Sequence, residues 1–138
     1  MKANELKPGN LVKSGTGIYK VFAISIPQIL AIQKYDEPED SQQNVYQSDN
    51  TIIEPIPLTA EWLKKLGFKR EIMGDMWIDL MTHYLVLKFM NGFYYPMYVQ
   101  LPEMGHEEEQ RVSLNRIKSV HELQNLFFVL TGEELLIK

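Results

Sequence analysis

The dipeptide Asn91-Gly92 constrains the fold of this chain more than any other feature. Two runs rich in aromatic and β-branched residues flank it, at positions 84–90 and 93–99. Asn and Gly both tolerate the positive φ angles that a two-residue hairpin turn requires. The pattern therefore predicts an antiparallel hairpin in the middle of a sheet-rich region.

A two-residue turn also fixes which residues of the hairpin face each other. Phe89 then lies opposite Tyr94, and Leu87 lies opposite Pro96 at a non-hydrogen-bonded pair. Both faces of the hairpin are largely apolar, so we expect both to be covered. Because Pro96 has no N–H to donate, residues 93–99 are predicted to be an edge strand near that proline, or to break there.

A short helix is predicted before this region. Thr59 can cap free backbone N–H groups, and Gly67 suits the position just after a helix. The prolines at positions 55 and 57 keep the preceding segment extended. A helix this short has to be held by packing.

A longer helix is predicted from about Val120 to Thr131. Ser119 and Glu122 have the form of a capping box, and Gly132 suits the C-terminal end. One apolar face follows the helical period; it comprises Val120, Leu123, Leu126, Phe127 and Leu130.

The opposite side of the same helix carries His121, Gln124, Asn125 and Phe128. A large ring on a polar face indicates contact with something else. Two alternatives explain it: a partner subunit, or cover from the N-terminal part of this chain. His121, Asn125 and Phe128 are therefore candidate binding residues.

The N-terminal part reads as short strands separated by turns. Pro8-Gly9-Asn10 and the segment 14–17 are turn patterns, and the polar stretch 36–50 is expected to be a loop. The fold class is predicted to be α+β: an N-terminal SH3-like β half-barrel, a short helix, an antiparallel sheet and a C-terminal packing helix. Residues 1–138 are expected to form a single compact domain, with possible sub-parts 1–52 and 53–138.

Composition excludes several classes of protein. The chain has 138 residues, a formal net charge of −4 and no cysteine, so a disulfide scaffold and a thiolate metal site are excluded. No apolar run is long enough to cross a bilayer, and the N-terminus has no signal-peptide pattern. We expect a cytoplasmic protein that has no membrane partner.

Motifs for catalysis are sparse. No nucleotide-binding glycine motif or serine-hydrolase motif is present, and no two of the three histidines have helical metal-ligand spacing. No catalytic residue, metal or cofactor is predicted. An enzyme that combines His83 or His106 with a carboxylate remains a third class of function, which requires these groups to converge.

The segment 94–98 offers a candidate binding surface. Its rings, Tyr94, Tyr95 and Tyr98, could pack against a peptide, stack on bases, or simply belong to a small sheet. The leading prediction is a non-enzymatic protein-binding or adaptor module, with a protein partner or self-association. The alternative is a nucleic-acid-binding accessory protein that uses the basic N-terminal part; its candidate residues are Lys2, Lys7, Lys13, Lys20 and Lys34.

Three stretches together resemble a known family: residues 5–12 (ELKPGNLV), 55–68 (PIPLTAEWLKKLGF) and 120–135 (VHELQNLFFVLTGEEL). The family consists of small uncharacterised bacterial proteins that prophages and other mobile elements often carry. The resemblance implies a cytoplasmic accessory protein in a mobile-element context, and it implies no activity or site residue. Separately, PGNxV at 8–12 and GxYxV at 17–21 are similar to the opening strands of SH3-like barrels.

Overall fold

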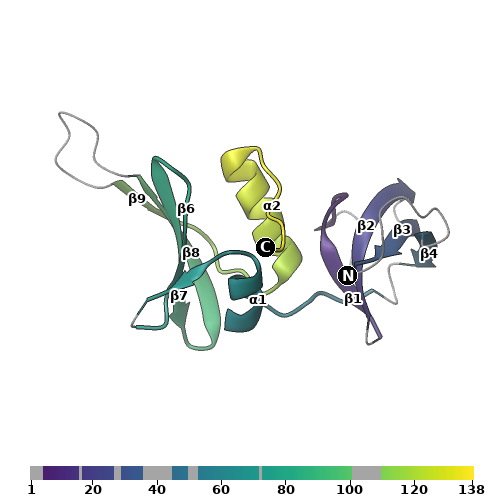
Figure 1. Cartoon of the computed structure of the whole chain (residues 1–138), viewed down its shortest axis with the longest axis horizontal. Helices are drawn as coiled ribbons and strands as arrows, with labels where there is room; N and C mark the ends of the chain where they lie inside the picture. The colour runs from purple at the N-terminus through teal and green to yellow at the C-terminus, as the bar shows by residue number, and fades with distance from the viewer. Residues whose placement is uncertain are drawn as a thin grey trace. The chain divides into compact units, whose positions relative to one another are not determined.

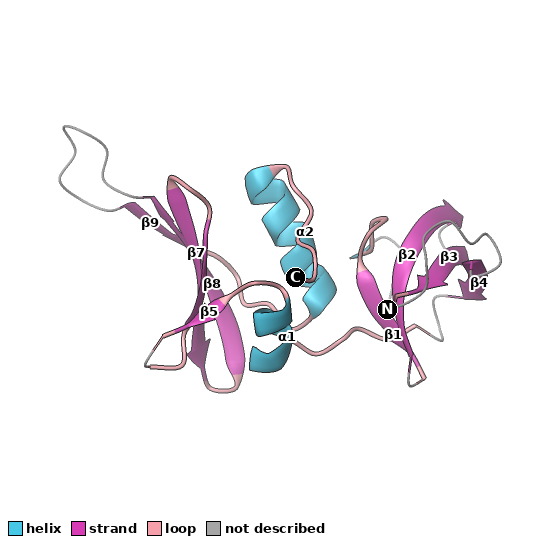
Figure 2. Cartoon of the chain, viewed as in Figure 1, coloured by secondary structure: helices cyan, strands magenta, loops and turns pink. Residues whose placement is uncertain are grey.

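The computed structural model describes residues 5–15, 17–26, 29–35, 45–49, 53–71, 73–100 and 110–138. These residues form two helices and two antiparallel sheets (Figures 1 and 2), which confirms the α+β class. The chain divides into two compact units. The first unit comprises Met1–Pro57 with Ser119–Glu134, and the second comprises Leu58–Lys118 with Leu135–Lys138. The sub-parts expected from sequence divide the chain at a different place, because the long C-terminal helix belongs with the N-terminal strands.

The first unit contains a four-stranded antiparallel sheet in the order β1-β2-β3-β4. Its strands are β1 (Leu11–Ser14), β2 (Gly17–Ile26), β3 (Ile29–Lys34) and β4 (Val45–Asp49). Glu54 makes an isolated two-way backbone pair with Lys13 on β1. The sheet does not close, so the SH3-like half-barrel is not confirmed.

Strand β4 corrects one sequence-based expectation. The stretch 36–50 was predicted to be a loop, yet residues 45–49 pair with β3. Val45 lies opposite Gln33 and Tyr46 lies opposite Ile32. Pairing with a neighbouring strand outweighs a polar local composition, because strand formation depends strongly on context. Residues 36–44 lie outside the described residues.

The described part of the core of the first unit includes one apolar cluster. Leu6, Val12, Val21 and Ile53 are buried together, and Tyr19 packs against them. Gly9 has a φ of +95°, which allows the tight turn before β1, and its N–H donates to the carbonyl of residue 21 at 2.8 Å. The predicted turn at residues 8–10 thus places the N-terminal segment against β2.

Helix α2 (Val120–Thr131) has the predicted bounds. Gly132 ends it with a left-handed φ of 74°, as expected for a residue after a helix. The predicted capping box is wrong for the Ser119 side chain. Ser119 is the N-cap residue, but its side chain caps no helix N–H; its Oγ instead lies 3.1 Å from Nδ1 of His121.

The second unit contains a five-stranded antiparallel sheet in the order β5-β6-β7-β8-β9. Its strands are β5 (Lys69–Arg70), β6 (Met76–Asp79), β7 (His83–Met90), β8 (Phe93–Gln100) and β9 (Gln110–Ser113). Asn91 and Gly92 have φ angles of 51° and 81°. The predicted hairpin register is confirmed: Phe89 faces Tyr94, and position 87 faces position 96.

Strand β8 is not an edge strand, which corrects the prediction made from Pro96. It continues through the proline, with β7 on one side and β9 on the other. The β9 ladder, however, covers only residues 97–100 of β8. Beyond its end, the Leu114 N–H donates to the Pro96 carbonyl at 2.9 Å. The proline is tolerated because only its carbonyl oxygen, and not an N–H, takes part in a hydrogen bond on the β9 side of the strand.

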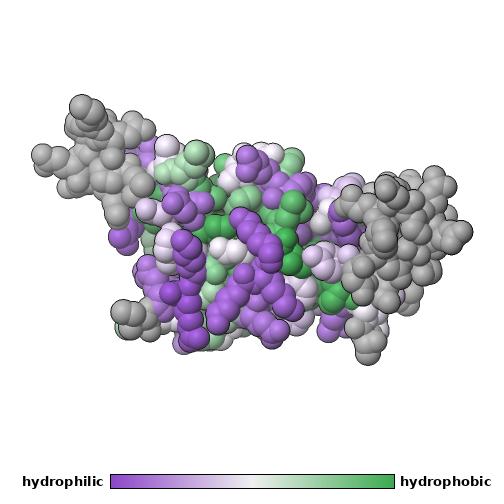
Figure 3. Space-filling view, in the orientation of Figure 1, coloured by the Kyte–Doolittle hydropathy of each residue, from purple (hydrophilic) through white to green (hydrophobic). Residues whose placement is uncertain are grey.

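Helix α1 (Ala60–Lys65) belongs to the second unit. The Thr59 hydroxyl oxygen accepts the Trp62 N–H at 3.3 Å, which confirms the predicted cap. Leu63 and Leu66 are completely buried. Glu61, Lys64 and Lys65 are exposed, and hydrophilic side chains gather over this helix in Figure 3. Neither α1 nor α2 has the length and apolar character that a membrane crossing requires, and no other helix lies among the described residues.

Candidate functional site

The strand register divides the second sheet into two different faces. The core face is buried over much of its area; its buried residues include Met76, Ile78, Leu85, Leu87, Tyr94 and Pro96. The other face carries Trp77, Tyr84, Val86, Met90, Phe93, Tyr95, Met97 and Val99. The first six of these residues are here called the aromatic face. The residues of the aromatic face are partly exposed, and Met90 reaches 48%, whereas the neighbouring Met97 and Val99 are 9% and 6% exposed. The prediction that both faces of the hairpin are covered thus holds for Met97 and Val99 and only in part for the residues of the aromatic face.

Cations accompany the rings of the aromatic face. The Lys69 ammonium lies 5.1 Å from the centroid of the Trp77 ring, and the Arg116 guanidinium lies 4.5 Å from that of Phe93. Lys88 shares this face, because it lies opposite Tyr95 in the ladder. Positive charge thus borders the apolar rings, although the whole chain is acidic.

The carboxylate of Asp79 also lies on this face of the sheet. Asp79 continues the row of Trp77 along β6. Its Oδ1 accepts the Met81 N–H at 2.8 Å. This contact fixes a turn residue with a φ of 73° and holds the acid at the end of the strand.

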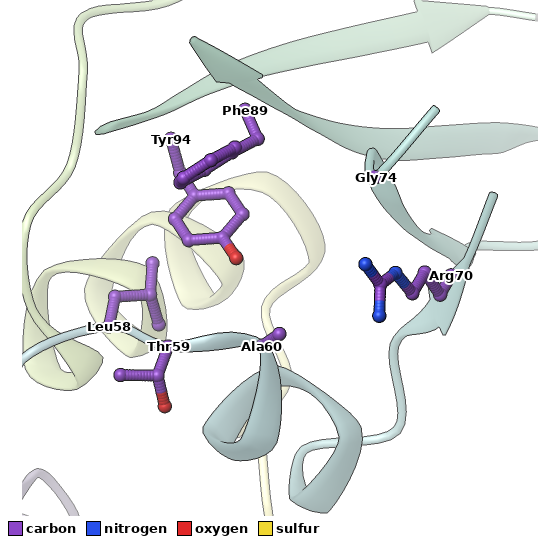
Figure 4. A pocket seen from close by; sticks show the side chains of 7 residues that line it. All are labelled: Leu58, Thr59, Ala60, Arg70, Gly74, Phe89 and Tyr94. Atoms are coloured by element: carbon purple, nitrogen blue, oxygen red, sulfur yellow. The ribbon is translucent and has the colours of Figure 1, made fainter. Parts of the chain in front are cut away.

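The core face of the same sheet carries a pocket of about 340 Å³. Its lining residues are Leu58, Thr59, Ala60, Arg70, Gly74, Phe89 and Tyr94 (Figure 4). All of them belong to the second unit. Phe89 and Tyr94 form a tilted ring pair with centroids 5.1 Å apart. Phe89 is 49% exposed at the rim, whereas Tyr94 is only 6% exposed.

Two polar groups face this pocket. The Tyr94 hydroxyl has no hydrogen-bond partner among the described residues, and Arg70 makes no ion pair there. Burial raises the pKa of Tyr94 above its ordinary 10.0, and the nearby Arg70 charge opposes that shift more weakly. The phenol is therefore neutral at physiological pH and can donate a hydrogen bond.

The three tyrosines that the sequence grouped together lie in different environments. Tyr94 lines the pocket, and Tyr95 lies on the aromatic face. Tyr98 stacks on His83 at a centroid distance of 4.7 Å. Adjacent strand residues point to opposite faces, so one segment cannot present Tyr94 and Tyr95 to one ligand.

The polar side of α2 packs on the N-terminal segment of its own unit. The Asn125 Oδ1 accepts a hydrogen bond from the Asn10 side chain at 2.9 Å, and the Asn125 amide donates to the Glu5 carbonyl at 3.0 Å. His121 is 3% exposed. Of the two explanations considered for this surface, the structure therefore shows cover from within the chain.

Phe128 lies at the edge of that contact. Its ring is 40% exposed, and the Lys7 ammonium lies 4.4 Å from its centroid. Lys7 also forms an ion pair with Glu134 at 2.6 Å. The Phe128 side chain is thus partly in contact with Lys7 of the same unit and partly exposed to solvent.

Three of the five candidate N-terminal lysines have interaction partners. Lys7 is paired as above, and Lys13 forms an ion pair with Glu54 at 3.4 Å. Lys20 also has an interaction partner. Only the backbone of Lys34 is described, and Lys2 lies outside the described residues.

The two described histidines, His83 and His121, each lie beside a hydroxyl group. Nδ1 of His83 lies 2.7 Å from the Thr82 hydroxyl, and the ring stacks on Tyr98. No group of three or more His, Asp or Glu residues that could hold a metal ion is found in the described part of the chain. His106 lies outside it, so the enzyme alternative stays an untested prediction.

Sequence reasoning missed Arg70, Phe89, Trp77 and Phe93 as candidate site residues. The predicted hairpin register already placed Phe89 opposite Tyr94, which was the one indication in the sequence that Phe89 belongs to the same site. Arg70 joins them only through the order of the strands, which the sequence did not reveal.

No protein-family model, curated protein or solved structure matches this chain. The resemblance to small bacterial proteins of mobile elements therefore stays a prediction, as does the likeness to SH3-like barrels. Function has to be inferred from the chain's own residues.

Proposed function

We propose that the protein is a non-enzymatic binding module that docks a protein partner on its aromatic face. The observation that carries this proposal is the set of rings that share one incompletely covered sheet face; they are Trp77, Tyr84, Phe93 and Tyr95. Contiguous exposed apolar patches mark interaction sites. Trp, Tyr, Phe, Met and Arg are also the residue types enriched at protein interfaces.

The charges at this face indicate the chemistry of the partner. Lys69, Lys88 and Arg116 accompany the rings, whereas Asp79 lies at the strand end. A segment that carries apolar side chains next to Asp or Glu complements both features. Complementary charges of this kind favour fast association and the correct partner.

Single-stranded nucleic acid is a second candidate for the same face. The ring–cation pairs Lys69–Trp77 and Arg116–Phe93 support it. Bases can stack on aromatic rings while neighbouring cations contact phosphates. This alternative differs from the one based on the N-terminal lysines, since two of those are ion-paired.

The test uses the full chain against two probes, a library of random peptides and an oligothymidylate of about 15 nucleotides. We expect the selected peptides to combine apolar and acidic residues. Their binding should be lost in Trp77→Ser and Tyr95→Ser and retained in Val129→Ser. Val129 is the control because it is 80% exposed and belongs to the other compact unit.

Salt separates the two candidates. Apolar docking depends weakly on ionic strength, whereas phosphate contacts weaken steeply as salt rises. Selected peptides that bind at about 0.5 M salt support the protein-binding proposal, since charge contacts are then heavily screened. Oligothymidylate binding that is steeply salt-dependent, without any selected peptide, would replace it by the nucleic-acid alternative. Binding of neither probe would contradict both.

A further inference from the structure

The pocket on the core face of the second sheet is chemically distinct from the aromatic face. We propose that it binds a carboxylate group carried on an apolar body, with Arg70 and Tyr94 as the groups that hold the carboxylate. The occupant is a small carboxylic acid or the end of a peptide, which share this chemistry. The inference is independent of the docking surface proposed above.

The strand ladder places Arg70 and Tyr94 on the same face of the sheet. Arg70 pairs with Met76, Met76 with Leu87, and Leu87 with Pro96, so the four side chains share the core face. Tyr94 lies two residues from Pro96 on that same face. Figure 4 shows the guanidinium group of Arg70 directed toward the Tyr94 hydroxyl from the other side of the pocket.

The Tyr94 hydroxyl is the observation that points to a ligand. Tyr94 is 6% exposed, and its hydroxyl has no hydrogen-bond partner in the described part of the chain. Buried polar groups are nearly always hydrogen-bonded, so an unpartnered one that faces a pocket asks for an explanation. A ligand oxygen at this position would satisfy it.

Arg70 has its charge available for the same ligand. Glu71 and Asp75 are its acidic neighbours in the β5–β6 turn, and neither forms an ion pair with it. The Asp75 Oδ1 instead accepts the Phe89 N–H at 3.2 Å. Asp75 is thereby hydrogen-bonded to the backbone of β7.

The balance of the lining favours a carboxylate over a phosphate. The described lining has one cation, the Tyr94 hydroxyl and an otherwise largely apolar surface from Leu58, Ala60 and Phe89, because the Thr59 hydroxyl is occupied by the Trp62 N–H. A planar guanidinium matches a carboxylate with two parallel hydrogen bonds. A phosphate dianion would leave charge uncompensated in these surroundings. A volume of about 340 Å³ is at the small end for ligand pockets, which suits one ring with a short acid arm.

The experiment is calorimetric titration of the full chain with phenylacetate, its neutral analogue phenylacetamide, and inorganic phosphate. Two further probes are acetylated tetrapeptides that end in phenylalanine, one with a free carboxylate and one amidated. The variants are Arg70→Gln and Tyr94→Phe. The control is Lys69→Gln, because Lys69 neighbours Arg70 but lies on the other face of the sheet.

We expect phenylacetate or the free-acid peptide to bind, and their neutral counterparts to bind at least about tenfold more weakly. Arg70→Gln should weaken binding about tenfold or more, Tyr94→Phe about fivefold, and Lys69→Gln by less than twofold. Preference for phenylacetate identifies a small acid as the source, and preference for the peptide identifies a chain end; either supports the proposal.

Three results would overturn the proposal. The first is that neither acid probe binds. The second is that the neutral probes bind as well as the acids, or that Arg70→Gln binds like the original protein. The third is preferential binding of inorganic phosphate. Urea unfolding of each variant shows whether a loss of binding reflects a loss of folding.

Discussion

The backbone N–H of Leu11 donates a hydrogen bond to the Gln124 side chain at 2.8 Å, although 113 positions separate the two residues. Both residues are buried, and the Gln124 amide also approaches the Gly9 carbonyl at 3.4 Å. A polar side chain of the last helix thus supplies an acceptor for the first strand. This contact explains why α2 belongs to the same compact unit as β1.

Replacing Gln124 with alanine should therefore destabilise the protein. The Leu11 N–H would be left buried without its acceptor, and such a loss typically amounts to about 1–3 kcal/mol. Urea unfolding measures the effect. Val129→Ala on the exposed side of α2 is the matched control and should change the free energy of unfolding by less than about 0.5 kcal/mol. Equal stability of the two variants would contradict this role of Gln124.

Ser119→Ala tests how α2 begins. The sequence suggested a conventional cap, whereas the Ser119 hydroxyl pairs with His121 in a buried position. We expect a loss of about 1 kcal/mol from the broken side-chain hydrogen bond. A double-mutant cycle with His121→Leu decides whether the lost stability comes from the Ser119–His121 hydrogen bond or from a helix cap. If the pair is responsible, the effect of Ser119→Ala shrinks in the His121→Leu background; an unchanged effect would restore the capping explanation.

His121 should make stability depend on pH. Burial lowers the pKa of His121 below its ordinary value of 6.5, and the neighbouring Glu122 and Glu5 oppose this more weakly. The unfolded chain therefore binds a proton more readily than the folded chain. The stabilisation is fully present above pH 6.5 and is lost as the pH falls through the lowered folded pKa.

The measurement is urea unfolding at about pH 7.5 and 5.5, which bracket the ordinary histidine pKa. The original protein should lose more stability between these pH values than His121→Gln does. Comparing the two proteins removes the contribution of the carboxylates, which titrate in both. An equal or larger loss in the variant would show that His121 is not the group responsible.

Tyr94→Phe should separate folding from ligand binding. The hydroxyl makes no hydrogen bond within the described residues, so its removal should leave the free energy of unfolding within about 0.5 kcal/mol or raise it. Urea unfolding of the ligand-free protein measures this, and Tyr94→Ala serves as a comparison that also removes the buried ring. Destabilisation of Tyr94→Phe by more than about 1 kcal/mol would mean that the hydroxyl has a structural partner.

Local patterns predicted much of the fold. Asn91 and Gly92 determine their turn through their own φ preferences, so the hairpin register followed directly. The bounds of α2 followed in the same way from its apolar period and Gly132. These features depend on residues that are close together in the sequence, so the sequence alone is enough to predict them.

Features that depend on distant partners were missed. β4 forms because its backbone pairs with β3. β8 pairs on its second side with β9, which begins only at residue 110. Likewise, Arg70 and Tyr94 line one pocket only through the order of the strands from β5 to β8. The candidate pocket could not be assembled from sequence because its members are neighbours through tertiary pairing.

The central claim, that the aromatic face docks a partner, can be tested on the two tryptophans of the chain. Trp77 lies on that face, whereas Trp62 lies on α1 with Lys65 over its ring at 4.8 Å. The measurement is the NMR shift of each indole N–H as a peptide selected on the protein is added. The account predicts that the Trp77 signal moves with saturation while the Trp62 signal stays in place. A Trp77 signal that remains fixed while the peptide binds would contradict it.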